Sequence, residues 1–348
     1  MSKHFVYILL LSLAMLASSC DPHEWPELPE TELYVDLVFD FSNLPIYKDI
    51  TITHTSSNTR ANRQQRLLQQ PEMRYQVRCY ALSADSVSYE LMPEAQFTFL
   101  NSNLQDPNYR CHISLKPGQY KVKVWADYVD KGTPADAYYA TTDFRNITFT
   151  GDAAAYTGST ELRDAFEGEH VVVVSETPDQ ARPSNVSARI MMQRPFAKFQ
   201  FVTTDLADFV GKYLGITDPE AISRLDLTDY RVLFRYTGYL PTNYNMLTGR
   251  PFDAAMGYEF FSSITSPTAT EATLGFDYFF VNGQTASVSV AVGIYNREGQ
   301  LLSFSDPIEV PLVRNHLTIV RDRFLTQGGS GNVGINPHYD GSYTIYIE

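Results

Sequence analysis

Apolar and polar residues alternate along most of the chain beyond residue 31. Every second residue from Leu33 to Phe41 is apolar, while Asp36 and Asp40 occupy the other side. A period of two residues sustained over such a segment predicts a β-strand with one buried face. Comparable patterns, bounded by turn residues, predict further strands. These lie at 75–82, 96–100, 109–115, 120–128, 170–175, 186–192, 195–202, 229–236, 272–281, 286–295, 308–312, 316–324 and 343–348.

Helical patterns are short by comparison. Residues 205–214 and 219–224 are the best helix candidates, and residues 161–166 predict one helical turn. Aromatic residues make up 13% of the chain and charged residues only 19%, a composition typical of half-buried sheets. We therefore predict an all-β fold of two tandem β-sandwich domains with few short helices. The predicted domain boundaries are 32–192 and 193–348.

The N-terminal segment has the pattern of a secretory signal. Lys3 precedes an apolar run at residues 5–16, which is shorter than the roughly 20 residues that a membrane-spanning helix needs. The sequence Leu-Ala-Ser-Ser-Cys at 16–20 then resembles a bacterial lipobox, although Ala17 stands where Leu is usual. We predict a signal peptide at 1–19 and acyl chains on Cys20, which would form a lasting membrane anchor. An ordinary signal peptide beside an incidental cysteine is the alternative.

Two segments of this chain lack the alternation. Residues 20–31 hold three prolines and four acidic residues, so we predict an extended tether of roughly 30 Å at about 3 Å per residue. The polar stretch 42–71 contains Arg60, Arg63 and Arg66. Arginines in such a stretch are ordinarily solvated.

Net charge and cysteine content limit the possible partners and covalent cross-links of this protein. A formal net charge of -13 argues against a nucleic-acid partner, because phosphate binding needs a basic face. With Cys20 lipidated, Cys79 and Cys111 remain in an oxidising compartment. One disulfide between them would stabilise the fold by roughly 3 kcal/mol. Two buried free thiols are the equally weighted alternative.

Catalytic and metal-binding motifs do not stand out. The seven histidines share no ligand spacing, and H-E-x-x-H, C-x-x-C and G-x-S-x-G motifs are missing. The Gly-rich segment 328–331 lacks the Lys-Ser/Thr of a phosphate loop. We therefore expect no enzymatic activity, no metal and no cofactor. Trp125, Tyr128, Tyr138 and Tyr139 suit a sugar-binding platform, but core packing is the favoured interpretation of these aromatic residues.

Several segments resemble the fimbrillin-like surface lipoproteins of Bacteroidales. The resemblance lies in the sequences at 116–130, 162–166, 194–199, 236–241, 274–278 and 311–320. It implies two transthyretin-like sandwiches, export by lipidation and display on the outer membrane. In polymerising members of that family, a protease cuts after an arginine and removes the first strand, and a neighbouring subunit supplies a replacement.

On this chain, the resemblance implies that segment 33–41 is the removable strand and that Arg60, Arg63 or Arg66 is the cut site. The favoured alternative is an anchor or tip-like subunit that keeps its first strand, with these arginines in an ordinary solvated loop. The C-terminal strand at 343–348 is the candidate donor. The expected function is a fimbrium-type anchor, tip or stalk subunit at the cell surface, whose partners are other surface subunits. A surface lipoprotein that binds a glycan or a host ligand is the alternative, and an envelope hydrolase would need a catalytic cluster that the sequence does not show.

Overall fold

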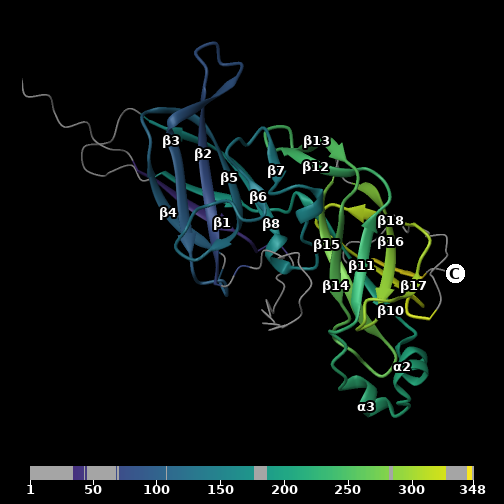
Figure 1. Ribbon diagram of the computed structural model, residues 1–348. Coiled ribbons are helices and arrows are strands. Elements are labelled where there is room, and N and C mark those ends of the chain that lie inside the picture. The colour runs from purple at the N-terminus through teal and green to yellow at the C-terminus, as the bar shows by residue number, and fades with distance from the viewer. Residues whose placement is uncertain are drawn as a thin grey trace, which may run out of the picture.

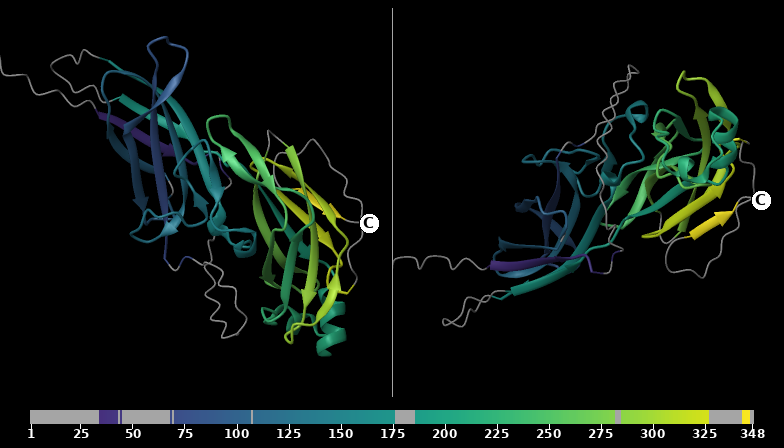
Figure 2. Two further views of the ribbon diagram at one scale, coloured as in Figure 1. Left: turned by 45° about the horizontal axis from the view of Figure 1, so that its top comes forward. Right: turned by 90° about the horizontal axis from the view of Figure 1, so that it is seen from below.

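The computed structural model describes residues 34–42, 44, 68, 70–106, 108–175, 186–281, 285–326 and 343–346. Over these residues the protein is built from β-sheets, which confirms the predicted all-β class. The sheets form two lobes that lie next to each other (Figures 1 and 2). The signal peptide, Cys20 and the tether lie outside the described residues. No helix in the described ranges is long and apolar enough to cross a bilayer.

The N-terminal lobe consists of two sheets whose inner faces share a core. The first has the order β4 (Tyr109–Ser114), β1 (Tyr34–Asp40), β9 (Val186–Met191). The second has the order β3 (Tyr89–Asn101), β2 (Pro71–Leu82), β5 (Gly118–Asp130), β8 (Ala165–Val174). Tyr75 of β2 stacks on Tyr109 of β4 with ring centroids 5.1 Å apart, so the two sheets face each other as a sandwich.

The C-terminal lobe repeats this plan. One sheet has the order β15 (Ala272–Phe280), β10 (Phe196–Thr203), β19 (Leu317–Asp322), β20 (Tyr343–Tyr346). The other has the order β14 (Glu259–Ser263), β11 (Arg231–Tyr236), β16 (Thr285–Tyr295), β17 (Leu301–Phe304), and β18 (Ile308–Val313) also pairs with β16. Phe201 of β10 packs against Phe234 of β11 across the two sheets, with ring centroids 5.4 Å apart. The predicted boundary at 192/193 falls between β9 and β10, and it remains a prediction.

A fifth sheet joins the two lobes. Its order is β13 (Arg250–Ala255), β12 (Leu240–Asn245), β7 (Ile147–Phe149), β6 (Tyr139–Ala140). Tyr244 of β12 pairs with Ile147 of β7, so this sheet combines strands from both halves of the chain, as Figure 1 shows between the lobes. The buried apolar residues of the two lobes accordingly form one continuous cluster. We call this region of contact between the lobes the seam.

The two helices lie where the sequence predicts them, at 205–214 and 219–224, to within one residue at each end. Helix α2 (Leu206–Leu214) stops at Gly215, whose φ of +68° is a left-handed conformation that glycine adopts without strain. Helix α3 (Pro219–Ser223) begins after Asp218, whose side chain accepts a hydrogen bond from the Ala221 amide. Both lie at the far end of the C-terminal lobe (Figure 1). Two 3₁₀ turns, η1 (Ala153–Ala155) and η2 (Glu161–Arg163), belong to the seam side.

The strand predictions hold where the alternation is clear, and the structure adds five strands that were not predicted. These are β6, β7, β12, β13 and β14. The predicted helical turn at 161–166 is correct for residues 161–163, whereas residues 165–166 begin β8. The four aromatic residues considered as a sugar platform are at most 7% exposed, so they pack in the core.

Candidate functional site

The predicted lipidation and processing residues lie outside the part of the chain that the structure describes. These are Cys20, Arg60, Arg63 and Arg66. Cys79 on β2 and Cys111 on β4 are both free thiols and both buried. Burial raises the pKa of each thiol to about 12, so both are protonated and unreactive at neutral pH.

Strand β1 lies at the centre of its sheet. It runs antiparallel to β4 and parallel to β9, so both of its edges carry main-chain hydrogen bonds. The side chains of Val35, Leu37 and Phe39 point into the core, and each is 0% exposed. Phe39 stacks on Tyr75 with ring centroids 4.9 Å apart. If β1 were absent, β4 and β9 would each be left with an unpaired edge, and three apolar pockets would open between them.

The end of β1 is fixed by polar contacts. The Asp40 carboxylate accepts a hydrogen bond from Nε of Arg189 on β9 at 2.5 Å and another from the Ser42 amide at 2.9 Å. These hydrogen bonds lower the pKa of Asp40 to about 2, with that from Arg189 as the largest cause. The backbone oxygen of Asp40 accepts from the Met192 amide at 2.8 Å. The contacts hold β1 to β9 beyond the last strand pair.

The predicted donor strand, β20, is paired within its own lobe. It runs parallel to β19, with Thr318 opposite Tyr343 and Arg321 opposite Tyr346. The pairing spans four residues at the edge of the sheet. By contrast, β1 pairs with neighbours on both sides. Because β20 has one neighbouring strand, fewer main-chain hydrogen bonds oppose its release.

A buried ion pair crosses the seam. Nη1 of Arg163 lies 3.2 Å from Oδ1 of Asp277, and the two side chains are 3% and 0% exposed. Oδ2 of Asp277 accepts hydrogen bonds from the hydroxyls of Tyr156 (2.8 Å) and Tyr236 (2.7 Å), and Oδ1 also accepts from the Tyr278 amide (2.8 Å). Burial raises the pKa of Asp277, but four donors at the carboxylate favour its ionised form.

Further buried charges surround this pair. Arg194 and Asp164 form an ion pair at 2.7 Å with side chains 6% and 4% exposed. Glu167 on β8 accepts hydrogen bonds from Arg314 and, at 2.6 Å, from the Tyr244 hydroxyl. Each contact joins a residue of the N-terminal lobe to a residue of the C-terminal lobe or of the segment between β9 and β10, which contains Arg194. Because a buried charge is costly without its partner, separating the lobes at these contacts would be strongly unfavourable.

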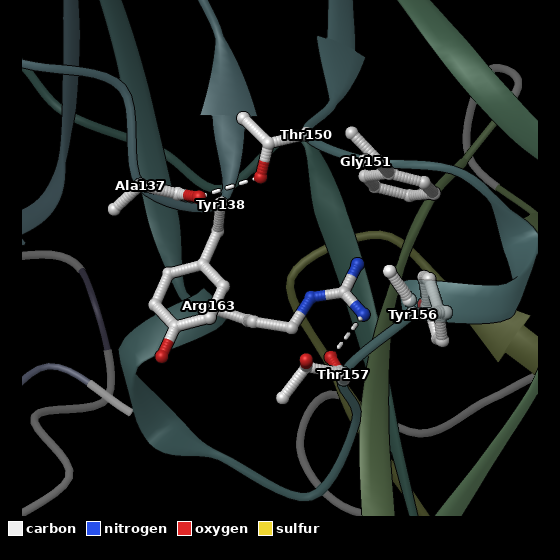
Figure 3. Close-up of a pocket in the computed structure, with 9 residues that line it drawn as sticks. Ala137, Tyr138, Thr150, Gly151, Tyr156, Thr157 and Arg163 are labelled. Atoms are coloured by element: carbon white, nitrogen blue, oxygen red, sulfur yellow. Dashed lines mark hydrogen bonds between the residues drawn. The ribbon is translucent and has the colours of Figure 1, made fainter. Parts of the chain in front are cut away.

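A small pocket opens beside the Arg163–Asp277 pair. Its volume is about 160 Å³, and its lining is Ala137, Tyr138, Phe149, Thr150, Gly151, Ala155, Tyr156, Thr157 and Arg163. The Arg163 guanidinium lies 4.3 Å from the Tyr156 ring centroid and 4.7 Å from that of Phe149. Nη1 donates to the Thr157 carbonyl oxygen at 2.8 Å, whereas Nη2 is buried without a hydrogen-bond partner among the described residues. Figure 3 shows this second nitrogen pointing away from Thr157.

Neither Arg163 nor Asp277 stands out in the sequence as a functional residue. One signal was available, since Asp277 stands alone within the aromatic run Phe276 to Phe280, and a buried carboxylate needs a cationic or hydrogen-bonding partner. Nothing in the sequence identified that partner 114 residues away. Within the described ranges, no group of three or more His, Cys, Asp or Glu side chains is arranged to bind a metal ion.

The fold and the seam define a class of two-lobed β-sandwich proteins whose lobes share a core. The chain belongs to DUF6562, described as a family of unknown function, whose model matches residues 40–348. No curated protein matches the chain in sequence.

The chain is similar to solved structures from Bacteroides and Porphyromonas species. A Bacteroides thetaiotaomicron protein provisionally named as polysaccharide binding is 11% identical, with 78% of this chain and 80% of that chain covered and a TM-score of 0.42. The fimbrial anchor protein Mfa2 of Porphyromonas gingivalis is 10% identical (78% and 82% covered, TM-score 0.34). The tip fimbrial protein Mfa3 of P. gingivalis, with a C-terminal truncation, is 12% identical (80% and 81% covered, TM-score 0.38). Likenesses this distant carry no conclusion about what the present chain binds.

Proposed function

We propose that this chain is a surface lipoprotein, held in the outer membrane by acyl chains on Cys20, that serves as a non-enzymatic subunit of a fimbrium-type assembly. Subunits join by strand addition at the position of β1. The single observation that carries the proposal is the place of β1, which pairs on both edges and buries Val35, Leu37 and Phe39 completely. A strand in this position can be replaced by another of the same direction and the same alternation.

Strand addition has a defined geometry here. A donor must run antiparallel to β4 and parallel to β9, and it must place apolar side chains at every second position. Burying three side chains of this kind contributes roughly 5–9 kcal/mol at about 1.5–3 kcal/mol each. Main-chain hydrogen bonds on both sides add to this. The C-terminal segment 343–348 of a second copy, with sequence YTIYIE, is the proposed donor.

The lipid anchor and the exchange of β1 divide the assembly into two kinds of subunit. A cut after Arg60, Arg63 or Arg66 separates β1, together with Cys20, from the rest of the chain and frees the groove for a donor. A copy that escapes the cut keeps β1, stays on the membrane and occupies the base of the assembly. Mass spectrometry of the native N-terminus on intact cells measures the ratio of the two forms, and a Cys20→Ala variant tests the anchor by membrane fractionation.

A controlled cut tests strand addition in purified protein. Residues 60–66 are replaced by the recognition sequence of a site-specific viral protease, and the cut chain is incubated with a synthetic peptide of residues 343–348. We expect the peptide to displace β1 and to remain bound to the body. Leu37→Ala, which weakens β1, should speed the displacement, whereas Val38→Ala on the opposite face of β1 is the matched control. A cut chain that keeps β1 at saturating peptide and forms no oligomers would refute strand addition.

A further inference from the structure

A lysine is buried at the seam beside a carboxylate. The Lys198 side chain on β10 is 5% exposed, and its Nζ lies 2.5 Å from Oε1 of Glu161 in η2. Nζ also lies 4.1 Å from the ring centroid of Phe276 and 5.1 Å from that of Tyr278. Burial lowers the pKa of Lys198, because these aromatic surroundings solvate an ammonium poorly. The neutral amine, which is the nucleophilic form, is therefore easier to reach here than at the surface.

The carboxyl group of Glu161 is held from its other side. The Tyr278 hydroxyl donates a hydrogen bond to Oε2, the oxygen that is not paired with Lys198. The backbone of the turn is capped by Thr160, whose hydroxyl accepts from the Leu162 amide at 3.3 Å. Two groups held in contact react as if they were highly concentrated, with effective molarities that reach about 10⁵–10⁸ M. The amine and the carboxyl group are therefore positioned to react with each other.

The surrounding charges do not require the ion pair to persist. Asp164 and Arg194 lie close by and pair with each other at 2.7 Å, so each of these two charges has its own partner. Replacing a buried ion pair by a neutral group is often stabilising, because two charges no longer have to be kept out of water. The Glu161 side chain is 28% exposed, so a water molecule released at this position can leave.

We propose that Lys198 and Glu161 condense into an isopeptide bond that joins the two lobes covalently. A proton passes from Nζ to Oε1 along their hydrogen bond, which gives a neutral amine and a carboxylic acid. Nζ then forms a bond to the carboxyl carbon, and Oε1 leaves as water with its own proton and one from Nζ. The Tyr278 hydroxyl stabilises the negative charge that develops on Oε2 during this step. The reaction needs no oxidant, reductant or second reactant.

The bond changes the seam from a set of ion pairs into a covalent connection. Glu161 lies between β7 and β8, and Lys198 lies on the first strand of the C-terminal lobe, 37 residues further along the chain. A cross-link of this kind restricts the unfolded chain and so favours the folded state. The inference depends neither on strand addition nor on the lipid anchor.

Peptide mass spectrometry of the purified full-length protein tests the bond. Trypsin does not cut after an acylated lysine, so the bond yields one branched fragment in which residues 146–163 are joined to residues 190–212. Its mass should equal the sum of the two peptides less one water. We expect this fragment to be the main form of both segments after denaturation. Recovery of residues 146–163 and 190–198 as separate linear peptides would overturn the inference.

Three variants identify the two partners. Lys198→Arg keeps a positive charge beside Glu161, but a guanidinium holds its proton and is not acylated, so the branched fragment should disappear. Glu161→Gln should yield the same fragment with the same mass, because ammonia then leaves in place of water. Lys212→Met is the matched control, since Lys212 also lies over a ring, 4.9 Å from the Tyr213 centroid, but is exposed, and its removal should leave the bond in place. A branched fragment that persists in Lys198→Arg would refute the assignment.

Discussion

Replacing Asp277 by Asn is the most direct test of the seam. The substitution keeps the shape of the side chain but removes its charge. In the native protein, Asp277 is 0% exposed and accepts from Arg163 and from the hydroxyls of Tyr156 and Tyr236. With Asn at this position, the Arg163 guanidinium stays buried without a counter-ion, and an amide nitrogen in the place of Oδ2 faces the hydroxyls of both Tyr156 and Tyr236.

The expected loss is large for a single substitution. Breaking a buried ion pair by removing one partner costs about 3–5 kcal/mol, out of a total stability that is typically about 5–15 kcal/mol. Urea unfolding followed by tyrosine and tryptophan fluorescence measures the change. With a slope near 3 kcal/mol per M, the unfolding midpoint should fall by roughly 1–2 M.

Two comparisons separate the ion pair from general effects of the substitution. Asp208→Asn removes a carboxylate that pairs with Arg323 on the surface, where the side chains are 60% and 45% exposed, and it should cost less than about 1 kcal/mol. The double variant Arg163→Met/Asp277→Asn should be less destabilised than the sum of its single changes, since no lone charge remains. A loss below about 1 kcal/mol for Asp277→Asn would show that the seam does not depend on this pair.

Three further predictions concern the N-terminal lobe. Phe39→Ala should destabilise the protein by about 3–5 kcal/mol in urea unfolding, while Val38→Ala on the other face of β1 should cost much less; equal losses would contradict the buried register. The stabilisation from the Asp40 charge should be complete above the unfolded pKa of about 3.9 and should fall as the pH drops towards about 2. The difference in unfolding midpoint between Asp40→Asn and the native protein should therefore shrink over that pH range. A difference that stays constant would exclude the Arg189 contact as its cause. Cys79 and Cys111 should react with a thiol reagent only in denaturant, because both are buried with pKa values near 12; rapid labelling of the native protein would contradict this.

The sequence predicts strands well wherever one face is buried and the other is not. Strand β1 alternates between fully buried and partly exposed side chains over most of its length, so its period of two is clear in the sequence. The helix ends were also readable, since Gly215 and Pro219 have local reasons for their positions. In these elements, the residues that determine the secondary structure are close together in the sequence.

The missed elements depend on contacts between distant residues. Strand β13 has no fully buried residue, so the burial pattern that marks a strand is missing, and β6 has only two residues. Both exist because β12 and β7 pair across the seam, with Tyr244 opposite Ile147. The pairing of Arg163 with Asp277 is likewise a product of the completed fold. Local propensity carries no information about such partners.

The positions of β1 and of the seam determine whether the exchange of β1 that we propose is compatible with a fixed arrangement of the two lobes. The inward side chains of β1 pack within the N-terminal lobe, where Phe39 stacks on Tyr75. Beyond β1, the ring centroids of Phe41 and Phe166 are 5.0 Å apart. The Arg194 guanidinium of the seam lies over the Phe166 ring, 5.0 Å from its centroid. Because Arg194 is held independently by Asp164, release of β1 removes one contact from the seam and leaves its ion pairs in place. The strand exchange that we propose would therefore open the groove while the two lobes keep their arrangement.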